Sequence, residues 1–137
     1  MQRTLFLLLL PFFFAAAPPT LAQTVIYTTA QHPVKTPEPG VLVFRLDEAA
    51  QLEQSLFPHL SDNPEQAEQQ ARRMMQLPDR KSREAQLTGA YQALIAAWSA
   101  GVAKTPAIVF DDRYVVYGTT DIALAQQLLS KWREQRP

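Results

Sequence analysis

The chain contains no cysteine. It can therefore form no disulfide, and its stability must come from packing alone. Thiol–disulfide exchange is excluded as well, because that reaction needs a thiolate to attack and a sulfur to be attacked. A lipid anchor on cysteine after an N-terminal apolar segment is excluded for the same reason.

Histidine is scarce, and basic residues are not in excess. The only histidines, His32 and His59, have no helical i, i+4 partner and no cysteine beside them, so we predict no metal site and no cofactor. Lys and Arg total 13 and Asp and Glu total 13, which argues against nucleic-acid binding through a basic surface. No Gly-x-Ser-x-Gly motif for a nucleophilic serine is present. We predict no catalytic residue, with a non-thiol enzyme using His32 and Lys35 as the alternative.

Residues 1–22 have the pattern of a secretory signal peptide. Arg3 precedes an apolar run from Leu5 to Ala17, and Thr20 and Ala22 are small residues at the cleavage-determining positions. The run is shorter than the ~20 residues of a membrane span, so we expect cleavage and no stable span afterwards. An uncleaved anchor is the alternative. Residues 23–137 then form a single domain.

Two apolar segments open this domain. Residues 25–29 and 41–46 are rich in β-branched and aromatic side chains. The first is nearly continuous rather than alternating, as expected of a central strand that is covered on both faces. Residues 30–40 contain three prolines and a glycine, so we predict a loop without a regular helix.

Three helices are predicted next. Asp47 is expected to cap the first, Asn63 with Pro64 marks the start of the second, and the third runs from about Arg80 or Ser82 to Ala100. Apolar residues at spacings of three and four define the faces expected to be buried. These are Leu46, Ala49, Leu52, Leu56 and Leu60; Ala67, Ala71, Met74 and Met75; and Leu87, Ala90, Tyr91, Leu94, Ala97 and Trp98.

The C-terminal part is predicted as a helix stop, a hairpin and a last helix. Gly101 suits a helix end with positive φ, and residues 107–110 and 114–117 read as strands joined by a polar turn. The turn explains Asp111 and Asp112 better than a catalytic carboxylate pair does. The last helix is expected from Thr120 to about Gln135. Its predicted buried residues are Ile122, Ala125, Leu128, Leu129 and Trp132.

The run Gly101-Val102 followed by Thr105-Pro106-Ala107 resembles the C-terminal half of a thioredoxin-like domain, with periplasmic disulfide isomerases as the closest likeness. The continuation from Phe110 to Gly118 is similar to a family of secreted proteins encoded on integrating conjugative elements. That family resembles the thioredoxin-like pilus-assembly proteins of conjugative transfer systems. The likeness covers most of the chain after the signal peptide and is strongest from Gly89 to Ala125.

The resemblance implies an α/β fold: a thioredoxin-like mixed sheet with a helical insertion, in the order β-β-α-α-α-β-β-α. It implies that residues 25–29 and 41–46 are parallel neighbours, so the loop between them must cross over without a full helix. It also implies a cis bond between Thr105 and Pro106 before the hairpin. His32 and Lys35 would stand where the active relatives carry their two cysteines.

By the same resemblance, a groove made by His32, Pro33, Thr105, Pro106 and Tyr114 would bind an extended segment of a protein partner. The implied function is that of a non-catalytic periplasmic component of a conjugative transfer apparatus, similar to type IV secretion. A chaperone or stabiliser of a pilus or channel subunit is the alternative besides the His32 enzyme. The simplest reading of Pro106 is that it only shapes the fold.

Overall fold

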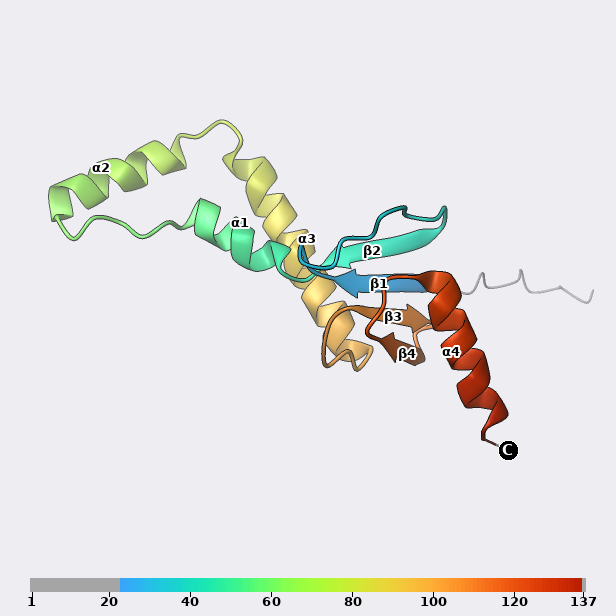
Figure 1. The fold of residues 1–137 in the computed structure, drawn as a ribbon. Coiled ribbons are helices and arrows are strands. Elements are labelled where there is room, and N and C mark those ends of the chain that lie inside the picture. Colours follow the sequence, from blue (N-terminus) through green and yellow to red (C-terminus); the bar gives the residue numbers. More distant parts are fainter. Residues whose placement is uncertain (1–22, 137) are drawn as a thin grey trace, which may run out of the picture.

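The computed structural model describes residues 23–136, so the predicted signal peptide lies outside the described part (Figure 1). The fold is mixed α/β, and its elements follow the order predicted from the sequence. The elements are β1 (Thr24–Thr28), β2 (Val41–Arg45), α1 (Glu48–Leu56), α2 (Pro64–Met75), α3 (Arg80–Ser99), β3 (Ala107–Phe110), β4 (Tyr114–Tyr117) and α4 (Ile122–Glu134).

The sheet has four strands in the order β2-β1-β3-β4. β1 pairs with β2 in parallel, from Thr24 with Val41 to Thr28 with Arg45, and this confirms the predicted parallel pairing. β3 is antiparallel to both β1 and β4. The segment between β1 and β2 crosses over without a helix, as expected from its prolines.

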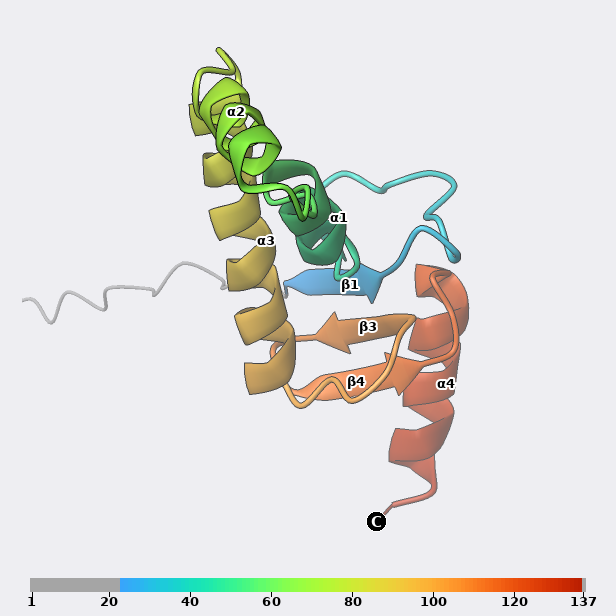
Figure 2. The same ribbon diagram turned by 90° about the vertical axis from the view of Figure 1, so that its left-hand side faces the viewer.

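Alternation along the strands supplies two apolar faces, each covered by a helix (Figure 2). On one face Ile26 and Ile108 are fully buried against Ile122 and Ala125 of α4. On the other face Val25 and Tyr27 of β1 pack with Val109 of β3 and with Ala97 near the end of α3. Val34 from the loop after β1 packs against the α4 face, where that loop partly replaces a crossover helix.

The helices between β2 and β3 form an arm. α1 and α2, with the first half of α3, extend away from the sheet (Figure 1). Asn63 caps α2 as predicted, because its side-chain oxygen accepts hydrogen bonds from the backbone N–H groups of Glu65 and Gln66, at 3.0 and 3.3 Å. The expected apolar side of α2 is only partly buried: Ala67, Ala71 and Met74 are half-buried, no residue of α2 is fully buried, and Met75 is 69% exposed.

Two details of α1 differ from the prediction. Asp47 precedes the helix but makes no side-chain cap hydrogen bond. The helix ends at Leu56, two residues before Pro58, so Leu60 lies beyond it and is exposed. The residue before a proline is disfavoured in the α region, which accounts for the early end.

The prediction that both tryptophans are core residues is wrong. Trp98 is 81% exposed, and Trp132 is 42% exposed. The face of α3 that is buried carries Ala90, Ala93 and Ala97. Small alanine side chains let the helix approach the sheet closely, and Trp98, one residue past Ala97, is turned by about 100° away from that face.

α3 ends just before Gly101, as the glycine predicted. Gly101 has a φ of +77°, and the N–H groups of Gly101 and Val102 donate to the carbonyls of Trp98 and Ala97 at 3.0 and 2.9 Å. This is the Schellman pattern, in which a left-handed glycine lets two N–H groups reach back to the last turn. The chain then enters β3 through Thr105 and Pro106, whose peptide bond is cis.

The hairpin and α4 complete the fold. Asp111 and Asp112 both have positive φ, and the N–H of Arg113 donates to the carbonyl of Phe110 at 3.1 Å, which is the turn role predicted for the two aspartates. α4 begins at Ile122 rather than Thr120, because Asp121 is its N-cap and accepts from the N–H of Leu124 at 3.1 Å. Across residues 23–136 no helix has both the length and the apolar character to span a membrane.

Candidate functional site

Two turns meet at one end of the sheet. Tyr27 near the end of β1 pairs with Ala107 at the start of β3, so Thr28, the last residue of β1, and Pro106, which precedes β3, are the next residues outward on neighbouring segments. Pro106 is buried, and its carbonyl accepts from the N–H of Gly118 at 2.9 Å. The antiparallel register therefore places the Thr105–Pro106 turn beside the loop that follows β1.

The loop after β1 is fixed at its root. Thr28 is buried, and its hydroxyl donates to the carbonyl of His32. The N–H of His32 donates to the carbonyl of Thr29 at 3.0 Å, which closes a tight turn. These bonds use only the backbone of His32, so its imidazole and the neighbouring Pro33 are exposed. The end of the sheet thus presents His32 and Pro33 on a rigid base.

Asp47 holds the same turn from the other side. Its carboxylate accepts from the N–H of Ala30 at 3.0 Å and from the side chains of Arg45 and Gln51 at 3.3 and 3.1 Å. The hydrogen bond from Ala30 is the main reason that the pKa of Asp47 is lowered, with Arg45 adding to the effect and partial burial opposing it. Sequence reasoning assigned Asp47 to a helix cap, and no local pattern pointed to Ala30, which lies far away in the chain.

Tyr117 fixes the segment that leads into Pro106. Its hydroxyl donates to the carbonyl of Gly101 and accepts from the N–H of Ala103, both at 3.1 Å. The Lys104 ammonium lies 5.3 Å from the centre of the same ring. Residues 101–104, which lead into the cis peptide, are thereby attached to β4 through one side chain.

Tyr114 does not share this end of the sheet. It pairs with Phe110, whereas Tyr117 pairs with Ala107. Strands rise ~3.3 Å per residue, so Tyr114 lies about 10 Å further along the sheet than Tyr117. Of the five residues proposed for the groove, the structure brings His32, Pro33, Thr105 and Pro106 to one end and places Tyr114 at the other.

A cavity of about 380 Å³ lies next to these turns. Residues 33–36 and 38 of the loop line one side, residues 119–122 at the start of α4 line the other, and the buried Ile26 contributes from β1. Pro33 is the one proposed groove residue that lines it. Thr119, Thr120 and Asp121 were predicted only as capping residues, so sequence reasoning missed their place opposite the loop.

The cavity is lined by polar and apolar groups from the loop, from β1 and from the segment before α4. Within the described chain no cluster of three or more His, Asp or Glu side chains is placed to hold a metal ion. Every buried side-chain nitrogen or oxygen from residue 23 to residue 136 has a hydrogen-bond partner, so none is left aimed at a missing ligand. What the cavity offers is threonine hydroxyls, the opposite charges of Lys35 and Glu38, and an apolar wall.

One of the comparisons with known proteins identifies a family. No curated protein and no solved structure matches the chain. Residues 21–135 match the family model described as "Protein of unknown function (DUF1525)". The match spans the entire fold from β1 to α4, and the chain therefore belongs to the DUF1525 family.

Proposed function

We propose that the chain is a non-catalytic, periplasmic protein-binding component of the conjugative transfer apparatus of an integrating conjugative element. The observation that carries the proposal is the meeting of two turns at one end of the sheet, the cis Thr105–Pro106 turn and the His32–Pro33 turn. In a thioredoxin-like domain the reactive cysteines occupy the second of these turns. This chain has the two turns but no cysteine, and we infer that their surface serves for docking.

The strand arrangement supports the thioredoxin-like part of the proposal. The resemblance requires that the first two strands run parallel, that the third strand run antiparallel to the first, and that a hairpin lead into a last helix. β1, β2, β3, β4 and α4 have these relations. Conjugation and export rest on the sequence resemblance and the signal-peptide pattern, and they are proposed by analogy.

Site-specific crosslinking in cells that carry the element tests the proposal. A photo-crosslinking residue replaces the exposed His32, and the matched control places it at Gln69 on α2. We expect His32 to give an adduct with a secretion-channel or pilus component, whereas Gln69 gives none. Adducts only from Gln69, or none from either position with the channel assembled, would contradict binding at this end of the sheet.

The same cells separate binding from the enzyme alternative. His32→Ala removes the only imidazole at the site, and its side chain makes no contact that the fold needs. Normal transfer by His32→Ala cells would leave the enzymatic alternative without a candidate residue. Loss of transfer with the protein folded and still crosslinked from Lys35 would instead favour chemistry at His32.

A chaperone or stabiliser is the second candidate, and the helical arm favours it. Phe57 and Met75 are more than half exposed, and Leu60 and Leu77 are exposed beside them. Such exposed apolar side chains, on an arm in which no residue of α2 is fully buried, are suited to covering another apolar surface. A deletion strain distinguishes the two roles, because a chaperone's client falls in abundance whereas a scaffold's partner keeps its level and fails to assemble.

A further inference from the structure

The outer edge of β4 is an open strand edge. β4 is the last strand in the sheet order. The hydrogen bond from the N–H of Gly118 to the carbonyl of Pro106 shows that these two residues form a hydrogen-bonded pair between the two strands. Hydrogen-bonded and non-hydrogen-bonded pairs alternate in an antiparallel ladder, so Val116 bonds to β3. Val115 and Tyr117 then direct their N–H and C=O groups away from β3, where an added strand could pair with them.

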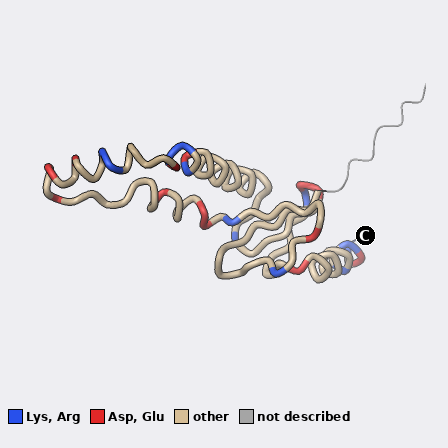
Figure 3. The backbone as a smooth tube through the Cα atoms, turned by 90° about the horizontal axis from the view of Figure 1, so that it is seen from above, with Lys and Arg blue, Asp and Glu red and all other residues tan. Residues whose placement is uncertain are grey.

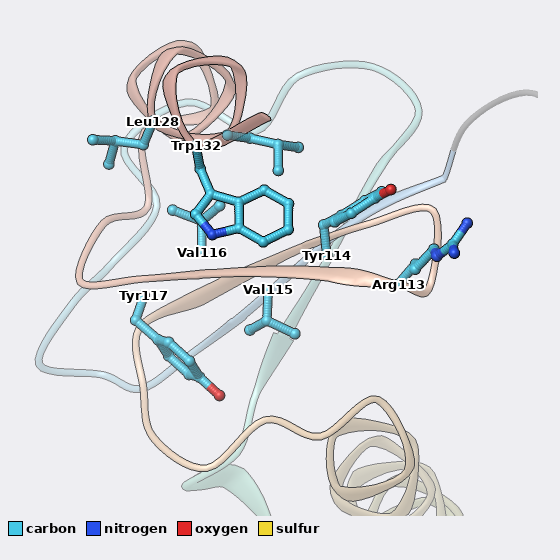
Figure 4. A pocket seen from close by; sticks show the side chains of 8 residues that line it. Arg113, Tyr114, Val115, Val116, Tyr117, Leu128 and Trp132 are labelled. Carbon is cyan, nitrogen blue, oxygen red and sulfur yellow. The ribbon is translucent and has the colours of Figure 1, made fainter. Parts of the chain in front are cut away.

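An apolar trough runs beside this edge. A cavity of about 420 Å³ is lined by residues 113–117 and by Leu128, Leu129 and Trp132 of α4. Trp132 and Leu128 hang over Val116, whereas the side chains of Val115 and Tyr117 point to the opposite face (Figure 4). The cavity is therefore lined by residues whose side chains lie on both faces of β4.

The trough exists because α4 is fully buried against the sheet only at its start, while Leu129 further along is only partly buried. Ile122 and Ala125 are buried, but Leu128 and Trp132 are 44% and 42% exposed. The second half of the helix runs past β4 (Figure 2). Trp132 meets the ring of Tyr114 edge-on at 6.1 Å between ring centres, so one end of the trough is closed by aromatic rings.

Cations surround the aromatic end of the trough. The guanidinium carbons of Arg113 and Arg133 lie 5.7 and 4.5 Å from the centre of the Tyr114 ring, and that of Arg136 lies 4.5 Å from the Trp132 ring. In Figure 3 basic residues gather at the C-terminal end of α4. Stacking on these rings holds three positive charges over a neutral, apolar surface.

A fourth cation lies at the other end of β4, where Lys104 covers the ring of Tyr117. Across residues 23–136 none of the four cations is in an ion pair. The acidic side chains near the trough are Asp111 and Asp112 in the hairpin turn and Glu134 on α4. The strand edge between the two ends carries no charge of its own, and cations flank it on both sides.

We propose that the β4 edge and the trough bind an extended, acidic segment of a partner protein, which adds to the sheet as a fifth strand. Its backbone pairs with Val115 and Tyr117, its apolar side chains enter the trough under Trp132, and its carboxylates meet Arg113 and Arg133. Charge complementarity selects this occupant. A second copy paired through β4 would add the uncharged strand Tyr114–Tyr117, which supplies no carboxylate to the four cations.

A peptide titration on the full chain tests this assignment. The probe is an acidic peptide of about eight residues, the length of an ordinary strand, with valines in its centre and glutamates at both ends, where the cations flank β4. The control peptides carry lysine in place of glutamate, or proline in place of the pairing residues. Trp98→Phe leaves Trp132 as the only tryptophan, and Trp98 is exposed enough to be replaced without loss of core.

We expect saturable changes in Trp132 fluorescence with the acidic peptide, and binding about tenfold or more weaker with the lysine peptide. Backbone amide signals of Val115 and Tyr117 should shift on binding. Arg113→Gln with Arg133→Gln should weaken binding about tenfold or more and reduce its salt dependence. The matched pair Arg72→Gln with Arg73→Gln, on exposed α2, should leave binding unchanged.

Three results would overturn the proposal. The first is equal binding of the acidic and lysine peptides, or no saturable binding of either. The second is a dimer of the unmodified chain in sedimentation that the acidic peptide does not dissociate, which would assign the edge to a second copy. The third is aggregation of the Arg113 and Arg133 variant while the unmodified chain binds no peptide, which would show that the cations prevent pairing of strand edges between molecules.

Discussion

The hydroxyl of Tyr117 provides the most direct test of the structure around the Thr105–Pro106 turn. Tyr117→Phe removes one oxygen and with it two hydrogen bonds, to the carbonyl of Gly101 and from the N–H of Ala103. A net hydrogen bond contributes ~0.5–1.5 kcal/mol to stability. Gly101 and Ala103 are exposed, so water replaces the lost partner, and each of the two bonds contributes at the lower end of this range, about 0.5 kcal/mol. The expected cost is therefore about 1 kcal/mol.

Tyr114→Phe is the matched control, on the same strand and with the same atom removed. Within the described chain the Tyr114 hydroxyl makes no hydrogen bond, and its ring contacts with Trp132 and Arg133 survive the change. It should alter the free energy of unfolding by less than about 0.5 kcal/mol. Urea unfolding measures both variants, and thermal unfolding should show the midpoint of Tyr117→Phe lower by about 4 °C in a domain of this size.

Amide hydrogen exchange locates the effect. Ala103 should exchange faster in Tyr117→Phe, because its N–H loses its partner, whereas the amides in the middle of β1 and β3 should change only with global stability. Equal stability of the two variants, with unchanged exchange at Ala103, would refute the claim that Tyr117 fastens the segment leading into Pro106.

Three further predictions concern acid stability, the core and the arm. Because the pKa of Asp47 is lowered in the folded state, its carboxylate stabilises the protein above the unfolded pKa, and this contribution is lost as pH falls through the folded pKa. Asp47→Asn should therefore make the urea midpoint of unfolding depend less on pH between about pH 5 and 2. Ile108 is fully buried, so Ile108→Val should cost ~0.5–1.5 kcal/mol and Ile108→Ala ~2–5 kcal/mol in urea unfolding. Asn63→Ala should destabilise α2 by about 1 kcal/mol and speed amide exchange at Glu65 and Gln66, yet barely change global unfolding, because no residue of α2 is fully buried.

The sequence predicted the elements that are set by local chemistry. Proline and glycine positions gave the loop before β2, the end of α3 at Gly101 and the start of α2 after Asn63, since each acts through its own backbone. The parallel pairing of the first two strands came from the resemblance, and the loop between them is barely long enough for the crossover. These features need no knowledge of which surfaces meet.

The buried faces were harder, because apolar spacing does not say which residues meet another element. On α3 the apolar spacing included both Ala97 and Trp98, but only Ala97 is buried against the sheet. The candidate groove failed at Tyr114 for a related reason. Antiparallel pairing reverses strand order, so the last residue of β4, Tyr117, reaches Pro106. The Asp47–Ala30 bond had no local sequence signal.

The place of β1 inside the sheet has a consequence for the order in which the chain folds. β1 is the first strand from the ribosome, yet one of its two neighbours, β3, is made only after the whole arm. A partial chain leaves Val25 and Tyr27 without Val109 and leaves Ile26 without Ile108. Such distant pairing is slow because the intervening loop must close first. The nascent protein thus carries an unfinished sheet through most of its synthesis, which is the interval in which a holding factor would protect it.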